Sequence, residues 1–163
     1  MQKKVLKGFT LIELVVTVAI VALLASAVLP VLQLSVQRVK ENQLRANLRE
    51  IREAIDAYKK LADVANSPIE KIVGQTGYPP NLAILVEGVI DKKDPNKRKI
   101  RFLRRIPQDP MHTISADDND ILGHWGLRSY ESEASDPQPG DDVYDVYSQS
   151  KQIGINGLPY SQW

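Results

Sequence analysis

Apolar residues are concentrated in one long run near the beginning of this chain. Residues 9–29 are almost entirely apolar, and Glu13 is the one charged residue among them. A helix of about 20 apolar residues crosses a hydrocarbon layer about 30 Å thick, so this run predicts a membrane-spanning helix. Lysines precede the run at Lys3, Lys4 and Lys7. Because positive charge stays on the cytoplasmic side, they orient the N-terminus toward the cytoplasm.

Helical periodicity resumes after Pro30 and ends near residues 66–68, which read Asn-Ser-Pro. A stripe of apolar residues with spacings of three and four indicates an amphipathic helix. Two heptads are too short for a coiled-coil seam, so we expect the C-terminal part of the same chain to cover this stripe. The stripe consists of Leu44, Leu48, Ile51, Ile55, Tyr58 and Ala62.

Pro30 interrupts this long helical pattern just after the apolar run. A proline inside a helix removes one backbone hydrogen bond and clashes with the preceding turn. Its simplest interpretation is the end of the membrane anchor. Because helical signals continue at once, we interpret Pro30 instead as a point where a continuous helix is softened.

The C-terminal half carries shorter signals. Residues 81–87 predict two helical turns, capped by Asn81 and stopped by Gly88. Residues 125–130 and 143–148 have strand composition, and the turn sequence at 137–140 separates them. We therefore predict an α+β fold in which a long N-terminal hydrophobic and amphipathic helix packs against a small C-terminal antiparallel sheet. The large aromatic residues of the final segment are expected to hold that segment on the core.

Composition excludes several classes of protein. The 163-residue chain has no cysteine and a formal net charge of +1, which excludes disulfide scaffolds and thiolate chemistry. Its two histidines, His112 and His124, make a zinc site improbable and are interpreted as structural or surface residues. No nucleophile–base pair or phosphate-binding loop is present in the sequence, so we expect a protein that is not an enzyme.

Charge is unevenly distributed along the C-terminal half. Residues 92–105 hold eight Lys or Arg residues and one Asp, interleaved with apolar residues. Binding of nucleic acid is one interpretation of such a segment. We prefer the interpretation of a solvated face whose apolar residues anchor it on the helix. The segment has one aromatic residue, and acidic clusters elsewhere in the chain balance its positive charge. We therefore expect no nucleic-acid partner. Attraction between the basic and acidic faces of neighbouring copies is a further hypothesis. The acidic clusters are Asp117, Asp118 and Asp120, then Asp136, Asp141, Asp142 and Asp145.

Glu13 separates three interpretations of the N-terminus. The first is a secretory signal cut near residues 25–27, which read Ala-Ser-Ala and would leave a secreted domain beginning at Val28. The second is a plain membrane anchor, and the third is a leader cut between Gly8 and Phe9. A carboxylate in a membrane span costs about 2.5–3.5 kcal/mol, so it is rarely found there without a partner. Glu13 therefore favours the third interpretation.

Residues 7–13, which read Lys-Gly-Phe-Thr-Leu-Ile-Glu, resemble the prepilin motif shared by type IV pilins and type II secretion pseudopilins. Residues 78–80, 102–110 and 144–148 and the final Trp163 resemble the major pseudopilins. The resemblance implies that prepilin peptidase cuts after Gly8 and methylates Phe9. It also implies that Glu13 faces the N-terminal ammonium of a neighbouring subunit, so that Phe9 and Glu13 are the assembly residues.

The resemblance further implies an organisation and a function. We expect a cleaved leader (1–8), a transmembrane and assembly helix (9–30), an amphipathic helix (31–66) and a periplasmic α+β portion (67–163). The expected function is that of a structural subunit of a type II secretion pseudopilus, anchored by a single span in the bacterial inner membrane. Its expected partners are further copies of itself, other pseudopilins and an inner-membrane assembly platform. A type IV pilin or minor pilin of a surface fibre is the alternative.

One departure from the family concerns metal. Calcium-binding major pseudopilins carry an Asp- and Gly-rich loop after the last strand, whereas residues 149–162 contain no Asp or Glu. Calcium needs several oxygen ligands that usually include carboxylates, so we carry over no metal site and expect no cofactor. Asp118, Asn119 and Asp120 with Gly123 imitate the start of a calcium loop, but Leu122 and Ser129 stand where acidic ligands belong.

Overall fold

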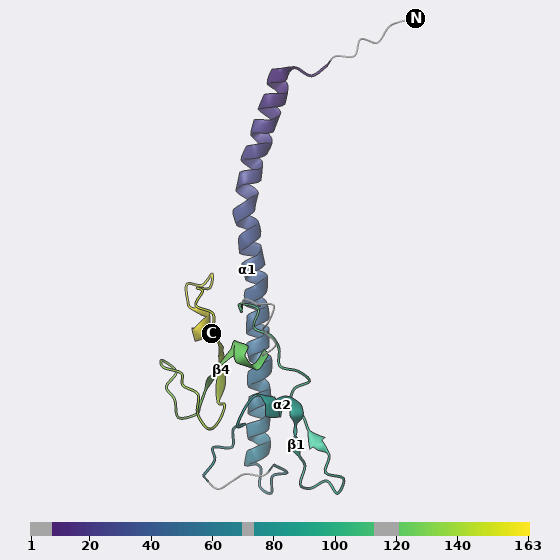
Figure 1. Cartoon of the computed structure of the whole chain (residues 1–163), viewed down its shortest axis with the longest axis vertical. Helices are drawn as coiled ribbons and strands as arrows, with labels where there is room; N and C mark the ends of the chain where they lie inside the picture. The colour runs from purple at the N-terminus through teal and green to yellow at the C-terminus, as the bar shows by residue number, and fades with distance from the viewer. Residues whose placement is uncertain (1–7, 70–73, 113–120) are drawn as a thin grey trace, which may run out of the picture. The chain divides into compact units, whose positions relative to one another are not determined.

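A computed structural model describes residues 8–69, 74–112 and 121–163 of the chain. The chain divides into two compact units, Met1–Val39 and Lys40–Trp163. The order of the elements can be followed in Figure 1. It is helix α1 (Leu11–Asp63), α2 (Ala83–Glu87), strands β1 (Val89–Ile90) and β2 (Lys99–Ile100), the 3-10 helix η1 (Ile121–His124), β3 (Trp125–Arg128), β4 (Asp145–Ser148) and the 3-10 helix η2 (Tyr160–Gln162).

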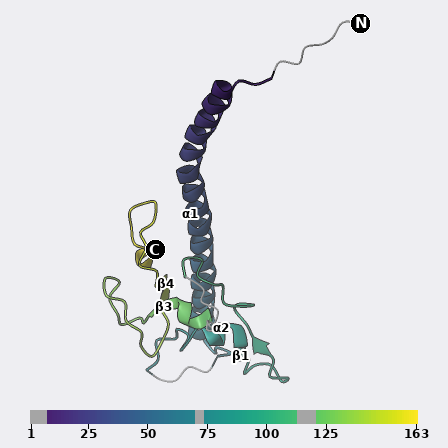
Figure 2. The same ribbon diagram turned by 45° about the horizontal axis from the view of Figure 1, so that its top comes forward.

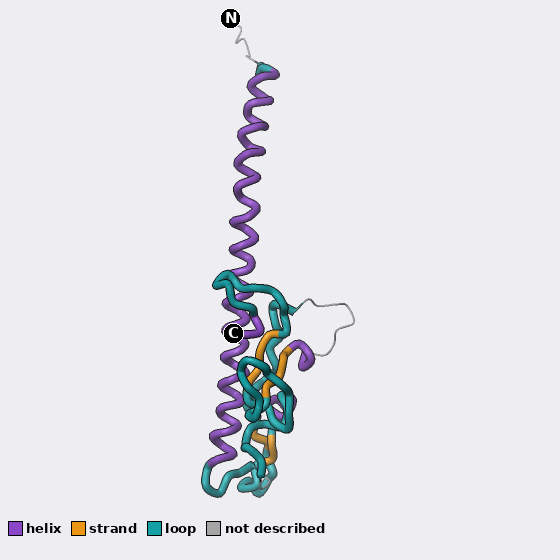
Figure 3. Tube along the Cα trace, turned by 90° about the vertical axis from the view of Figure 1, so that its left-hand side faces the viewer, coloured by secondary structure: helices purple, strands orange, loops and turns teal. Residues whose placement is uncertain are grey.

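The second unit is built on the part of α1 that begins at Lys40. The predicted apolar stripe is confirmed, because all six of its residues are buried with at most 6% of their surface exposed. The strands and loops of this unit lie along one side of its part of the helix (Figure 3). The stripe is therefore covered by the chain itself, as expected, and not by a coiled-coil partner.

The helix ends where the sequence predicts a stop. Its last residue is Asp63, and Asn66 takes a positive φ of 60°, a conformation that Asn tolerates better than most residues. The hydroxyl of Ser67 donates to the carbonyl oxygen of Leu61 at 2.8 Å and accepts from the N–H of Ile69 at 2.9 Å. These bonds satisfy a helix-end carbonyl and turn the chain back.

In the described residues, the strands form two separate antiparallel pairs. Strands β3 and β4 lie side by side (Figure 2), with Trp125 opposite Ser148 and Arg128 opposite Asp145. This pair confirms the predicted sheet, although both strands are shorter than predicted. Beyond Arg128, the N–H of Tyr130 donates to a carboxylate oxygen of Asp142 at 2.9 Å, so a side chain replaces the ladder there.

The second pair, β1 with β2, was not anticipated from the sequence. Val89 pairs with Ile100 and Ile90 with Lys99. It follows α2, whose predicted cap is confirmed because the N–H of Ile84 donates to Asn81 Oδ1 at 3.0 Å. The turn between α2 and β1 requires glycine, because Gly88 has a φ of 80° and a Cβ there would lie 2.7 Å from the carbonyl oxygen of Ile100.

The apolar residues of the basic segment anchor it on the core, as expected. Leu103 and Ile106 are buried, and the rings of Phe102 and Tyr58 pack with centroids 5.3 Å apart. Burial raises the pKa of the Tyr58 phenol. The basic side chains between these anchors, Arg104 and Arg105, remain exposed.

Candidate assembly site

The first unit presents an apolar surface that nothing in the described chain covers. The large apolar side chains that the structure describes from Phe9 to Val39 are between 47% and 81% exposed. The N-terminal part of α1 is long and apolar enough to cross a membrane, and none of that stretch is buried. An exposed apolar surface of this extent marks a membrane or assembly contact.

Thr10 and Glu13 meet at the start of α1. The N–H of Glu13 donates to the hydroxyl of Thr10 at 3.3 Å, so Thr10 caps the first turn. Sequence analysis missed this cap, which the spacing Thr-x-x-Glu indicates. A carboxylate in the first turn also lies favourably in the field of the helix dipole. Among the described residues, no cation pairs with Glu13.

The other predicted site residues lie around this helix start. Gly8 and Phe9 precede the first helical residue, and the Phe9 side chain is 80% exposed. Pro30 lies inside α1, which continues through it to Asp63. Pro30 therefore does not end the helix, and its interpretation as the end of the membrane anchor stays untested. Its role as a softening point, like the cleavage at Gly8 and the methylation of Phe9, stays a prediction.

In the second unit, Glu41 holds the segment that follows β4. One of its carboxylate oxygens accepts from the N–H of Ile155 at 2.7 Å and from the hydroxyl of Tyr160 at 3.0 Å. Glu41 and Tyr160 are 4% and 0% exposed. Sequence analysis missed Glu41, although its spacing of three and seven residues from Leu44 and Leu48 places it on the buried face of the helix.

Arg52 makes a second attachment to the same segment. Its guanidinium donates to Asp145 at 2.7 Å and to the main-chain oxygen of Trp163 at 2.7 Å. The guanidinium of Arg45 lies 4.3 Å from the centre of the Trp163 ring. These contacts confirm that the terminal aromatic residues hold the final segment on the core.

The segment after β4 does not fit a calcium ion. Its side chains supply no carboxylate, and Glu41, an acid that reaches it from α1, accepts from the N–H of Ile155 and the hydroxyl of Tyr160. No set of three or more His, Cys, Asp or Glu residues capable of holding a metal ion occurs in the described parts of the chain. The loop with Asp117, Asp118 and Asp120 lies outside the described residues.

The two histidines meet in the fold. The rings of His112 and His124 stack with centroids 3.9 Å apart, and His124 is buried. The sequence did not predict that they meet, because nothing in the intervening residues fixes their separation.

Known proteins resemble this chain in sequence. A family model described as the prokaryotic N-terminal methylation motif matches residues 4–29. The chain therefore carries this motif at its start. It is 28% identical to the type II secretion system core protein G of Aeromonas hydrophila over an alignment of 157 residues, which covers 80% of this chain and all of that protein.

Two further relatives bear the same name. The protein of Pectobacterium carotovorum subsp. carotovorum is 26% identical over 145 residues, covering 84% of this chain and 82% of that protein. The protein of Escherichia coli (strain K12) is 27% identical over 107 residues, covering 64% of the chain and 66% of that protein. No solved structure gave a significant match.

Proposed function

We propose that this chain is a structural subunit of a type II secretion pseudopilus, cut after Gly8 and methylated at Phe9. The observation that carries the proposal is the exposed apolar surface from Phe9 to Val39, which begins within the methylation motif. Three relatives named as type II secretion core protein G support it.

The apolar helix has two uses in this proposal. It anchors the subunit in the inner membrane before assembly, with the N-terminal lysines on the cytoplasmic side and residues 67–163 in the periplasm. It then packs against the same helix of other copies in a filament. Both environments remove the exposed apolar side chains from water, which stabilises each state.

Glu13 is the proposed assembly residue. The cut after Gly8 would create an ammonium at Phe9, and within lipid an isolated carboxylate and an isolated ammonium are each costly. When two subunits are staggered, the Glu13 carboxylate of one meets the ammonium of the other. Such a buried pair fixes the register between subunits more than it stabilises them.

The subunit has a mechanical role in this proposal and no enzymatic one. Its partners are other copies of itself, other pseudopilins, an inner-membrane platform and the prepilin peptidase that processes it. Hydrolysis of ATP belongs to a separate motor, and no nucleic acid is involved. Neither metal nor cofactor is needed for the subunit to fold and stack.

The test has two parts. N-terminal sequencing of the mature protein should give N-methylphenylalanine at position 9, whereas a start at Val28 would show a secreted domain. Glu13→Ala should leave a membrane-held monomer that assembles poorly. Thr10→Ala is the matched control, because it removes the helix cap and keeps the carboxylate, so it should assemble nearly normally.

Two results would reject the proposal: normal filament yield from the Glu13→Ala protein, or a mature protein that starts elsewhere. Filaments found only as long fibres on the cell surface would favour the type IV pilin alternative.

A further inference from the structure

Strands β1 and β2, the loop between them and Arg101 form a positively charged hairpin, called here the basic hairpin (residues 89–101). Lys93, Lys97, Lys99 and Arg101 are exposed on it. The N–H of Lys97 donates to the carbonyl oxygen of Asp94 at 2.9 Å, and the N–H of Asp91 to that of Arg98 at 3.0 Å. Because the loop is already ordered, binding through it loses little conformational entropy.

Asp94 organises this loop from within. Its carboxylate accepts from the N–H of Asn96 at 3.0 Å and pairs with the guanidinium of Arg98. These hydrogen bonds, that to Arg98 above all, hold the pKa of Asp94 below its usual value of 3.8. The Asp94 carboxylate is thus engaged within the loop, whereas Lys93, Lys97 and Lys99 are exposed on its surface.

A second surface, called here the acid–tyrosine groove, has the opposite charge. Its cavity of about 530 Å³ is lined by Tyr78, Glu131, Asp141 and Asp142 among others. The loop from 131 to 142 that borders it holds five acidic residues and no basic one. Asp142 is engaged by the hydroxyl of Thr76 and the N–H of Tyr130, whereas Glu131 and Asp141 are exposed.

Three tyrosine rings pack together beside this groove. Tyr78 lies 5.7 Å from Tyr130 and 5.0 Å from Tyr144, measured between ring centroids. Burial is the main cause that raises the pKa of Tyr78, with Tyr144 and Asp56 contributing. The ammonium of Lys59 lies 5.0 Å from the centre of the Tyr78 ring, and the guanidinium of Arg128 lies 4.7 Å from that of Tyr144.

Tyr130 differs from the other two rings. It is 57% exposed, and within the described parts of the chain no cation lies over it. A large exposed ring next to carboxylates is suited to a cationic side chain, which gains from both the ring face and the negative charge. The groove, together with the Tyr130 ring that packs on Tyr78 beside it, therefore has the chemistry to accept a lysine from another molecule.

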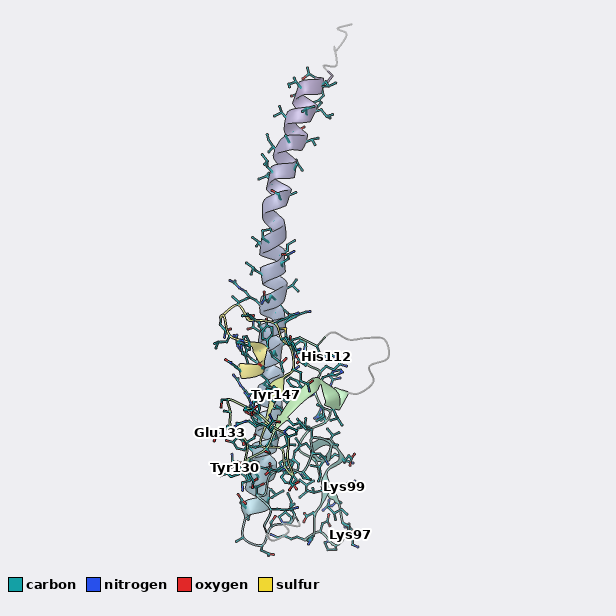
Figure 4. The ribbon with its side chains drawn as sticks, turned by 60° about the vertical axis from the view of Figure 1, so that its left-hand side comes forward. Lys97, Lys99, His112, Tyr130, Glu133 and Tyr147 are labelled. Carbon is teal, nitrogen blue, oxygen red and sulfur yellow. The ribbon has the colours of Figure 1, made fainter. Side chains whose placement is uncertain are left out.

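The two surfaces cannot meet within one chain. Figure 4 shows Lys97 and Lys99 on one side of the second unit and Tyr130 and Glu133 on the other. A contact between complementary patches on different sides of a molecule is heterologous, and repetition of such a contact gives an open filament or a ring. A second copy of the chain is therefore the partner that this charge arrangement fits.

We propose that the basic hairpin of one copy docks at the acid–tyrosine groove of the next, with Lys97 and Lys99 against Glu131, which lines the groove, and against Tyr130 and Glu133, which lie next to Glu131 in the chain. This proposal rests on the proposed function, since it concerns how the subunits of the filament contact one another outside the membrane helix. The apolar contact between membrane helices holds the subunits together. The proposed polar contact is additional, and it sets the direction in which subunits stack.

Cross-linking tests the contact in the full-length chain in membranes. The natural sequence has no cysteine, so Asn96→Cys combined with Ala134→Cys provides one reactive thiol at each surface and keeps every charge. A short bis-maleimide should then give a ladder of dimers, trimers and larger species, and either single variant should stay monomeric. Asn96→Cys with Ser161→Cys is the matched control and should give no ladder.

Charge reversal supplies the second arm. Lys97→Glu with Lys99→Glu should lower the filament yield about tenfold, because like charges would face each other. Glu131→Lys with Glu133→Lys should do the same, and the four changes together should restore the yield. Arg104→Glu with Arg105→Glu, which makes the same change of charge elsewhere in the basic segment, should have little effect.

The outcomes separate this proposal from the one on which it rests. If the natural chain forms filaments but the ladder and the rescue are both absent, the docking contact is rejected and the proposed function stands. If the natural chain forms no filaments, both are rejected. Dimers from the Asn96→Cys single variant would show that two hairpins meet each other, which also overturns the proposal.

Discussion

The hydroxyl of Tyr160 donates to the carboxylate of Glu41, a residue 119 positions earlier in the chain. Both side chains are buried. The same carboxylate oxygen accepts from the N–H of Ile155. One acid on α1 therefore holds both ends of the segment from Ile155 to Tyr160. Removing one partner of a buried hydrogen bond is costly, because the other partner stays buried and cannot bind water instead.

This relationship makes a stability prediction. Glu41→Ala should lower the free energy of unfolding by about 1–3 kcal/mol, because it leaves the donors of Ile155 and Tyr160 unsatisfied. Tyr160→Phe should cost less, since it removes one donor and keeps the ring. Urea unfolding of the second unit, followed by circular dichroism, measures both. Glu50→Ala, an exposed acid on the same helix, is the control, and an equal loss in that variant would contradict the prediction.

Gly126 makes a second prediction through its contact with Tyr147. A Cβ at position 126 would lie 2.3 Å from atoms of the Tyr147 ring. Gly126→Ala should therefore push the ring aside and destabilise the β3–β4 pair by about 1–3 kcal/mol. Adding Tyr147→Ala should cancel most of the further loss, as a double-mutant cycle would reveal. Additive effects of the two changes would show that the clash is not the cause.

Asp94 gives a prediction about pH. Its pKa is lowered in the folded state, chiefly by the hydrogen bond from Arg98. The stability that it contributes is therefore fully present above its unfolded value of 3.8 and is lost as the pH falls through the lower folded value. An NMR titration of the carboxyl group should place its midpoint below 3.8, and Arg98→Ala should move it upward. An unchanged midpoint in the variant would argue against the assigned cause.

Calcium should have no effect on the segment after β4. A bound ion at a hundredfold excess over its dissociation constant would add about 2.7 kcal/mol to stability. Because this segment is held by Glu41 and Arg52 and offers no carboxylate, we expect neither calcium nor EDTA to shift the unfolding midpoint. If calcium did raise the midpoint, Asp118→Asn with Asp120→Asn would test whether the ion binds in the loop that contains them.

Salt should weaken assembled filaments if charged faces hold neighbouring copies together. The screening length falls from about 10 Å at 0.1 M salt to about 3 Å at 1 M, which removes most of the attraction between exposed groups. We expect sedimented filament to decrease as salt rises, and the four-residue charge exchange described above to show the same dependence. Indifference to salt would count against an electrostatic contact.

The long elements of the fold were predictable because their residues repeat. The stripe from Leu44 to Ala62 has helical spacing over several turns, and this pattern persists whatever covers it. The predicted strands at 125–130 and 143–148 have strand composition and are separated by a proline-rich turn. The length of the first was overestimated because the carboxylate of Asp142 accepts from the N–H of Tyr130, a long-range contact that no local pattern contains.

The remaining features depend on contacts between residues that are far apart in the sequence or on segments too short to show a pattern. Each strand of the β1–β2 pair has two residues, which is too short for any periodicity. Glu41 looked like one more polar residue of a charged helix, although its place on the apolar face could have identified it. At the predicted assembly site, a sequence motif indicated Phe9 and Glu13. The Thr10 cap is indicated by a different signal, the Thr-x-x-Glu spacing of a helix start.

The basic hairpin and the acid–tyrosine groove occupy different sides of one unit, and this has a consequence for any row of stacked copies. The two tips of such a row are unlike, since one offers an unused hairpin and the other an unused groove. A related protein that had only one of these surfaces would join at one tip and block further addition there. The side chains of a single capping molecule would then decide where elongation stops.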